Sequence, residues 1–191
     1  MKLNQKFITI ISFLITIIFM FISFLFDKNL IEYIENSNNF VLNYLFSWSN
    51  FSFFLIIICF LFGLLYLWNI KKKEFIIPSF ITFIVTFFSI IFINLIVARD
   101  SPLENLNILF SITKYSFPCI FVAICFSLVG FFQNVSKKLL FFWLIFGIII
   151  GISKIILIQN YLSDILAGMI IGYVIGFLVF YITKKNNLFG V

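Results

Sequence analysis

The chain has 191 residues, of which 63% are hydrophobic and only 10% are charged. Soluble domains are about half apolar and about a quarter charged, so the composition excludes an ordinary soluble protein. The formal net charge is +6, but the lysines lie in short clusters between apolar runs. That arrangement is typical of membrane proteins, and it lacks the basic stripe of a nucleic-acid-binding surface. We therefore expect membrane lipids as partners and no nucleic acid.

A membrane-spanning helix requires about 20 mainly apolar residues. The first such run, 7–26, follows Lys2 and Lys6. It is longer than the apolar core of a usual signal peptide, so we expect it to remain in the protein. Residues 27–50 mix acids and amides with apolar residues at broken helical spacing. This pattern predicts one or two short amphipathic helices lying in the membrane interface.

Five further apolar runs follow the interfacial segment. The predicted spans are 51–68, 75–98, 117–133, 139–158 and 163–183. A polar stretch, 99–116, separates the third span from the fourth. The sequence therefore predicts a single integral membrane domain over residues 1–191. Its fold class is an all-α membrane protein, a six-transmembrane-helix bundle with an interfacial amphipathic segment after the first span.

The placement of lysine and arginine predicts the orientation of this bundle. One side collects Lys2, Lys6, Lys71, Lys72, Lys73, Lys137, Lys138, Lys184 and Lys185. The loops of the other side carry Lys28, Arg99 and Lys114 and most of the acids. We expect a multi-pass protein of the cell membrane with both termini in the cytoplasm. A functional site, if present, is then expected on the polar outer face.

Two charged residues near the turn between the predicted fifth and sixth spans require an explanation. Lys154 lies about one turn inside the fifth span, where an ionisable side chain is a functional candidate unless its stem reaches the headgroups. Asp164 opens the sixth span. It is expected either to cap its own helix or to cap it and also pair with Lys154. The sequence leaves both alternatives open.

Small residues recur at four-residue spacing in the last two spans. They are Gly147 and Gly151 in the fifth, and Gly168, Gly172 and Gly176 in the sixth. This spacing lets membrane helices approach each other closely. It predicts tight packing of these spans within the bundle and does not require dimerisation.

The stretch that begins at Ser153 resembles the last signature of the type 2 phosphatidic acid phosphatase family, which includes lipid phosphatases and vanadium haloperoxidases. That signature reads Ser-Arg, five residues, His, three residues, Asp. The corresponding positions here are Ser153, Lys154, Asn160 and Asp164. The family's first signature, Lys, six residues and Arg-Pro, falls on Asn94, Ser101 and Pro102. Its second, Pro-Ser-Gly-His, falls on Pro118, Cys119, Ile120 and Phe121.

The resemblance implies a phosphoryl-transfer site in which most working groups are replaced. In the family the last His attacks phosphorus, the Asp orients it, the second-signature His protonates the leaving oxygen, and cations hold the phosphate. Here the nucleophile position is Asn160 and the acid position is Phe121. Of the three positions where the family has a phosphate-holding Lys or Arg, two carry the uncharged residues Asn94 and Ser101. Only the third, Lys154, still carries a cation. The chain contains no histidine, so the family's standard mechanism is excluded.

We therefore predict a catalytically inactive relative that binds a lipid-phosphate or isoprenoid-phosphate headgroup, or an unidentified protein, at the outer face. The ligand-binding candidates are Ser153, Lys154, Asp164 and Arg99, with a plain surface role as the alternative for Arg99 and Lys114. We expect no cofactor and no metal. One rival hypothesis is an active lipid phosphate or diphosphate phosphatase with non-standard groups, such as Cys119 at a helix N-terminus. Another is a lipid transporter.

Overall fold

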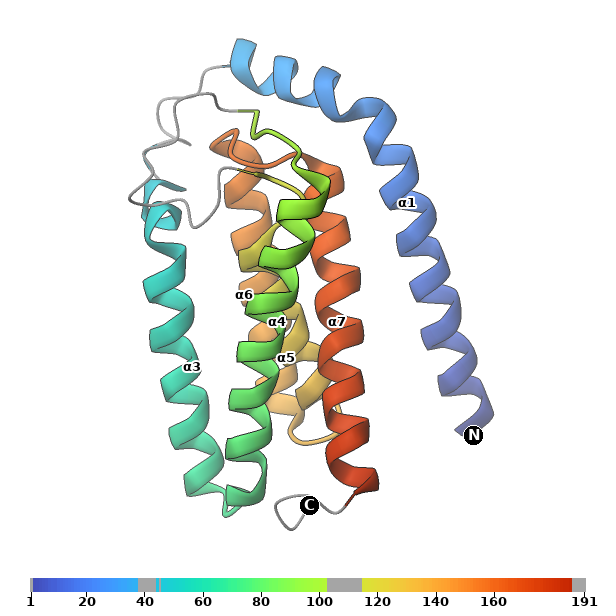
Figure 1. Ribbon diagram of the computed structural model, residues 1–191, viewed down its shortest axis with the longest axis vertical. Coiled ribbons are helices and arrows are strands. Elements are labelled where there is room, and N and C mark those ends of the chain that lie inside the picture. Colours follow the sequence, from blue (N-terminus) through green and yellow to red (C-terminus); the bar gives the residue numbers. More distant parts are fainter. Residues whose placement is uncertain (1, 38–43, 45, 103–114, 187–191) are drawn as a thin grey trace.

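The computed structural model describes residues 2–37, 44, 46–102 and 115–186, with the backbone alone at 2–13, 49 and 50 (Figure 1). Lys114 therefore lies outside the described residues. The helices are α1 (Lys2–Ser37), α3 (Ser52–Asn69), α4 (Ile76–Val97), α5 (Ile120–Phe132), α6 (Lys137–Ile156) and α7 (Leu162–Lys185). Two short 3-10 helices, η1 (Ser47–Phe51) and η2 (Lys73–Phe75), precede α3 and α4.

The predicted fold class is confirmed in the described part of the chain. Five helices are long and apolar enough to cross a membrane, namely α3, α4, α6, α7 and the part of α1 from Leu14 to Ser37. The sixth, α5, is apolar but shorter. Where the bilayer boundaries fall along these helices stays a prediction.

Helix α1 runs without interruption past the predicted end of the first span at residue 26. No glycine or proline occurs in residues 2–37 to break it. Figure 1 shows α1 rising beside α7 and then bending over the end of the bundle. The first part of the predicted interfacial segment, 27–37, is thus the bent end of α1. Most of the remainder, 38–43 and 45, lies outside the described residues.

Helix α5 occupies the centre of the bundle. Every residue of this helix is buried except Phe126, which is half-buried. Its 13 residues extend about 20 Å, which is less than the roughly 30 Å of a hydrocarbon core. The helices α4, α6 and α7 pack around it. Because protein surrounds this helix, an apolar surface on all its sides is expected.

The small-residue pattern in α7 serves its close packing against α5. A Cβ atom on Gly168 would lie 2.7 Å from the backbone oxygen of Cys119. On Gly172 and Gly176 a Cβ atom would overlap the backbone of α5 outright. The prediction of tight helix packing is therefore confirmed, and α5 is the helix on which the glycines of α7 pack.

Candidate functional site

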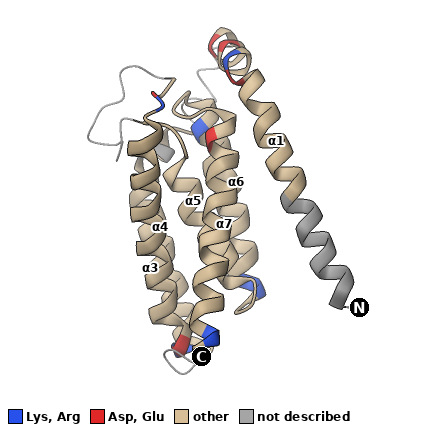
Figure 2. Cartoon of the chain, turned by 45° about the vertical axis from the view of Figure 1, so that its right-hand side comes forward, with Lys and Arg blue, Asp and Glu red and all other residues tan. Residues whose placement is uncertain are grey.

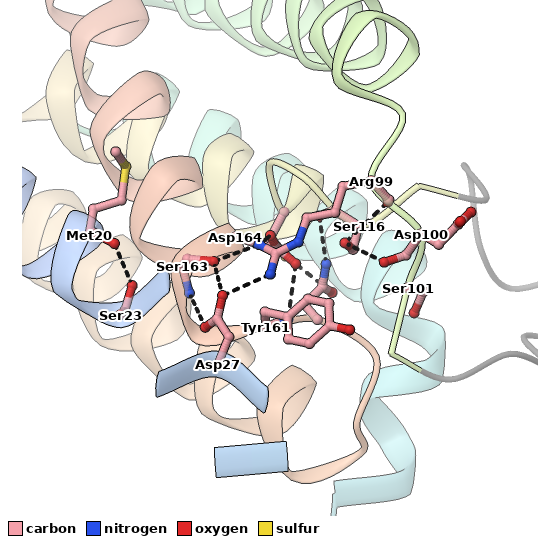
Figure 3. A network of polar contacts seen from close by, with 12 residues as sticks. Met20, Ser23, Asp27, Arg99, Asp100, Ser101, Ser116, Tyr161, Ser163 and Asp164 are labelled. Atoms are coloured by element: carbon pink, nitrogen blue, oxygen red, sulfur yellow. Dashed lines mark hydrogen bonds and ion pairs between the residues drawn. The ribbon is translucent and has the colours of Figure 1, made fainter. Parts of the chain in front are cut away.

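Five helices bring polar residues together at one end of the bundle, which we call the network end. It contains the bend of α1, the end of α4, the beginnings of α5 and α7 and the last turn of α6. Figure 3 shows the central contacts. The chain leaves α4 at Ala98, whose left-handed backbone (φ 48°) ends the helix. Arg99 follows directly and reaches across to the start of α7.

The guanidinium of Arg99 joins α1 and α7 through charge-assisted hydrogen bonds. Its Nη1 donates to Asp164 Oδ1 at 2.7 Å and to the hydroxyl of Ser163 at 2.6 Å, both in α7. Its Nη2 donates to Asp27 Oδ2 at 2.8 Å in α1. The fork of an arginine can reach two carboxylates at once, which the single ammonium of a lysine cannot match in geometry.

Both carboxylates of this network are buried and receive further donors. Asp27 Oδ1 accepts the backbone N–H of Ser163 at 3.1 Å, and Oδ2 also accepts the Ser163 hydroxyl. Asp164 Oδ2 accepts the backbone N–H of Tyr161 at 2.9 Å. Buried charges are tolerated only when they are paired and hydrogen-bonded. The network thus satisfies two buried acids and attaches α1 to α7.

Aromatic rings enclose the same guanidinium. The Cζ atom of Arg99 lies 4.0 Å from the ring centroid of Tyr161 and 5.1 Å from that of Phe24. These are cation–π distances. The side chain of Arg99 keeps 24% of its surface exposed, so it is neither free at the surface nor fully enclosed. The simpler prediction for Arg99, a plain surface role, does not hold.

The structure tests the two alternatives predicted for Asp164, capping alone or capping together with an ion pair to Lys154. This residue occupies the third position of α7, and its carboxylate accepts the backbone N–H of Tyr161, the N-cap residue, so capping is confirmed. The ion-pair partner that the structure gives to Asp164 is Arg99. Lys154, the partner considered from the sequence, instead donates from Nζ to Gln159 Oε1 at 2.7 Å.

Lys154 is buried beside Phe121, the position at which the second signature of the family has its histidine. Its residue exposure is 2%, and its Nζ lies 4.3 Å from the centroid of the Phe121 ring. The backbone oxygen of Lys154 accepts the N–H groups of Gln159 and Asn160 in the turn that follows α6. This turn therefore folds around Lys154 and contacts its charged end.

Asn160 and Cys119 lie together on the other side of this cluster. The Cys119 Sγ is 3.6 Å from Asn160 Oδ1, and Asn160 Nδ2 donates to the backbone oxygen of Ser116 at 2.8 Å. The backbone N–H of Cys119 donates to the backbone oxygen of Asp164 at 3.0 Å. The second and last signatures, which are far apart in the sequence, thus meet as the resemblance implied.

The remaining candidates take other positions. Ser101 reaches the cluster at its margin, where its hydroxyl donates to the backbone oxygen of Gln159 at 2.8 Å. The hydroxyl of Ser153 donates to the backbone oxygen of Ile150 within α6. Asn94 is fully buried in the last turn of α4, and its side-chain nitrogen and oxygen have no hydrogen-bond partner among the described atoms.

Sequence reasoning missed several members of the site, which are Asp27, Ser116, Gln159, Tyr161 and Ser163. Asp27 lies 72 positions from Arg99, and nothing local marks it as a partner. Gln159 lies five residues after Lys154 in a short polar turn. That proximity was a usable signal, because a turn directly after a helix can fold back onto its last charged side chain.

Comparison with known proteins identifies the architecture. The family model of the PAP2 superfamily matches residues 79–188, which is more than half of the chain. The chain therefore belongs to the PAP2 superfamily, and the resemblance predicted from the three signatures is confirmed. It is a multi-pass membrane protein related to lipid phosphatases.

A solved structure has the same fold. It is described as the first transmembrane PAP2 type phosphatidylglycerolphosphate phosphatase from Bacillus subtilis, and the TM-score is 0.68 at 15% identity. The match covers 91% of this chain and 96% of that chain. At this identity the likeness concerns the fold alone. The comparison with curated proteins gives no match.

Proposed function

We propose that this protein is a catalytically inactive member of the PAP2 superfamily. The observation that carries the proposal is the chemistry of the two positions where the family has histidine. Phe121 has no proton to transfer, and its ring lies against the Lys154 ammonium. Asn160 is not a phosphoryl acceptor, and its amide is engaged with Ser116 and Cys119. Loss of a nucleophile from a coupled catalytic set lowers rates by roughly a million-fold.

The state of Asp164 supports the same proposal. In the family this acid orients the attacking histidine. Here its two oxygens are engaged by Arg99 and by the Tyr161 N–H. Its function is then to hold α7 and α1 in place. The thiol alternative has little support, because Cys119 is 1% exposed and its sulfur faces an amide oxygen.

The first test is an assay of phosphate release by purified protein. The substrates are phosphatidylglycerolphosphate, phosphatidate and undecaprenyl diphosphate. We expect no release above that of a mock preparation, because neither a phosphoryl acceptor nor an acid is present at the required positions. Release that persists through repurification, and that falls in Lys154→Met or Cys119→Ser protein with an unchanged Tm, would show that the site is active.

We further propose that the remaining site recognises the phosphate headgroup of a membrane lipid, on the outer side of the cell membrane. Lys154 retains a positive charge beside the N-terminus of α5, where backbone N–H groups and the helix dipole favour an anion. Binding would require the Gln159 amide to give up its contact with Lys154 to the phosphate. A protein partner in place of the lipid is the competing outcome.

A thermal-shift experiment tests headgroup recognition. Short-chain phosphatidate should raise the Tm of the detergent-solubilised protein, and short-chain phosphatidylcholine should not. A ligand at 100 times its Kd stabilises by about 2.7 kcal/mol. Lys154→Met should reduce the shift, whereas Lys28→Met, at an exposed lysine of α1, should retain it in full. Equal shifts with both lipids, or a shift of undiminished size in Lys154→Met, would rule out this form of recognition.

A further inference from the structure

The end of the bundle opposite the network end carries a group of exposed lysines. We call this group the lysine face. Its members are Lys71, Lys73, Lys137, Lys138, Lys184 and Lys185. They come from three segments, which are the α3–α4 turn, the first turn of α6 and the last turn of α7. Figure 2 shows blue segments at this end of the bundle, and others at the network end. Glu74, half-buried, is the one acid that these three segments contribute.

The three segments are fixed to one another by specific contacts. Lys72 donates from Nζ to the backbone oxygen of Val135, which joins the α3–α4 turn to the α5–α6 turn. The ring of Phe75 stacks on Phe180 of α7 with centroids 6.2 Å apart, and it meets Phe131 of α5 edge-on at 6.4 Å. The segments that carry the exposed lysines are therefore held in fixed positions by packed helix ends, and the lysines share one surface.

An aromatic residue marks the level of this surface in the membrane. Trp68, in the last turn of α3, is 57% exposed, and the Nζ of Lys73 lies 3.8 Å from its ring centroid. Tryptophan is enriched at the boundary between hydrocarbon and headgroups. The lysine face then lies at headgroup level, where clustered lysines attract anionic lipids.

We propose that the lysine face is a binding surface for the anionic headgroups of membrane phospholipids. Its partner is a small group of lipids, each with a negatively charged phosphate, held by lysines from all three segments. The surface is separate from the candidate site, because it lies at the other end of the helices. The proposal does not depend on whether Lys154 binds a headgroup.

Native mass spectrometry of the purified full-length protein tests the proposal. The probes are phosphatidylglycerol and phosphatidylcholine of equal chain length. We expect phosphatidylglycerol to bind at least about tenfold more tightly, with retention falling as salt rises from low to high ionic strength. Equal retention of the two lipids, or retention that does not change with salt, would overturn the proposal without any variant being made.

Substitutions locate the binding on the protein. A fourfold variant, Lys137→Gln, Lys138→Gln, Lys184→Gln and Lys185→Gln, should lose the preference for phosphatidylglycerol. The same four positions changed to Arg should keep it, which also controls for changed orientation in the membrane. Lys28→Gln, at an exposed lysine of α1 outside the face, should keep it as well. A preference that survives in the fourfold Gln variant but is lost in Lys154→Met would assign the lipid to the candidate site and overturn the proposal.

A competition experiment separates lipid from free anion. Inorganic phosphate, at a concentration equal to that of phosphatidylglycerol, should leave the bound lipid in place, because a single small ion engages few of the lysines. If inorganic phosphate displaces the lipid at equal concentration, the surface is a simple phosphate site and the proposal of a lipid surface fails.

Discussion

Replacing Arg99 with Gln should lower the free energy of unfolding by about 3–5 kcal/mol, because it leaves the buried carboxylates of Asp27 and Asp164 without their shared cation. On a chain of this size such a loss lowers Tm by on the order of 10 °C. The fall in Tm is measured by thermal unfolding in detergent, with tryptophan fluorescence as the signal. We expect the largest effect of any single charge removal in the described part of the chain.

Three controls make the interpretation of Arg99→Gln specific. Arg99→Lys keeps the charge but loses the fork, so its Tm should fall between those of the wild type and Arg99→Gln. Lys28→Gln removes an exposed cation next to Asp27 and should leave Tm unchanged. Adding Asp27→Asn and Asp164→Asn to Arg99→Gln should recover part of the lost stability, because amides replace unpaired charges. A triple variant less stable than Arg99→Gln alone would contradict the ion-pair explanation.

Substituting Gly176 with Ala should destabilise the protein by about 3 kcal/mol. The new Cβ atom would overlap the backbone oxygen of Ser127, and neither helix can move without displacing the other contacts between α5 and α7. The same measurement of Tm in detergent checks this, and the variant should expose α5 to proteolysis at a lower temperature than the wild type.

Gly63 in α3 provides the matched control. A Cβ atom there would lie 3.9 Å from side-chain atoms of Leu139 and Trp143, an ordinary contact distance. Gly63→Ala should therefore be neutral or slightly stabilising, since alanine is favoured over glycine in a helix by about 1 kcal/mol. If both alanine variants lose stability equally, helix packing at Gly176 is not the cause.

Features with a local signal in the sequence could be predicted. The lengths of the apolar runs indicated the spans, and the spacing from Ser153 to Asp164 identified the signature because a helix end, a turn and a helix start hold it together. The small-residue spacing of α7 indicated close packing. The partner in that packing was not evident, because α5 presents apolar residues on every side and no single face is distinguished.

Features that depend on distant segments could not be predicted. The pairing of Arg99 with Asp27 requires α1 to bend next to the start of α7, and helical spacing says nothing about which helices become neighbours. The continuity of α1 was missed for a related reason. Acids and amides in residues 27–37 indicated an interfacial segment, yet residues of these types also continue a helix when no glycine or proline interrupts it.

The shortness of α5 has a consequence for the order in which the protein is built. A helix of this length cannot cross a hydrocarbon core alone, so its place in the membrane depends on the helices around it. The glycines on which it packs belong to α7, which follows both α5 and α6 in the chain. The packing around α5 is therefore complete only after α6 and α7 have also been synthesised, so α5 has to wait in the membrane for its partner.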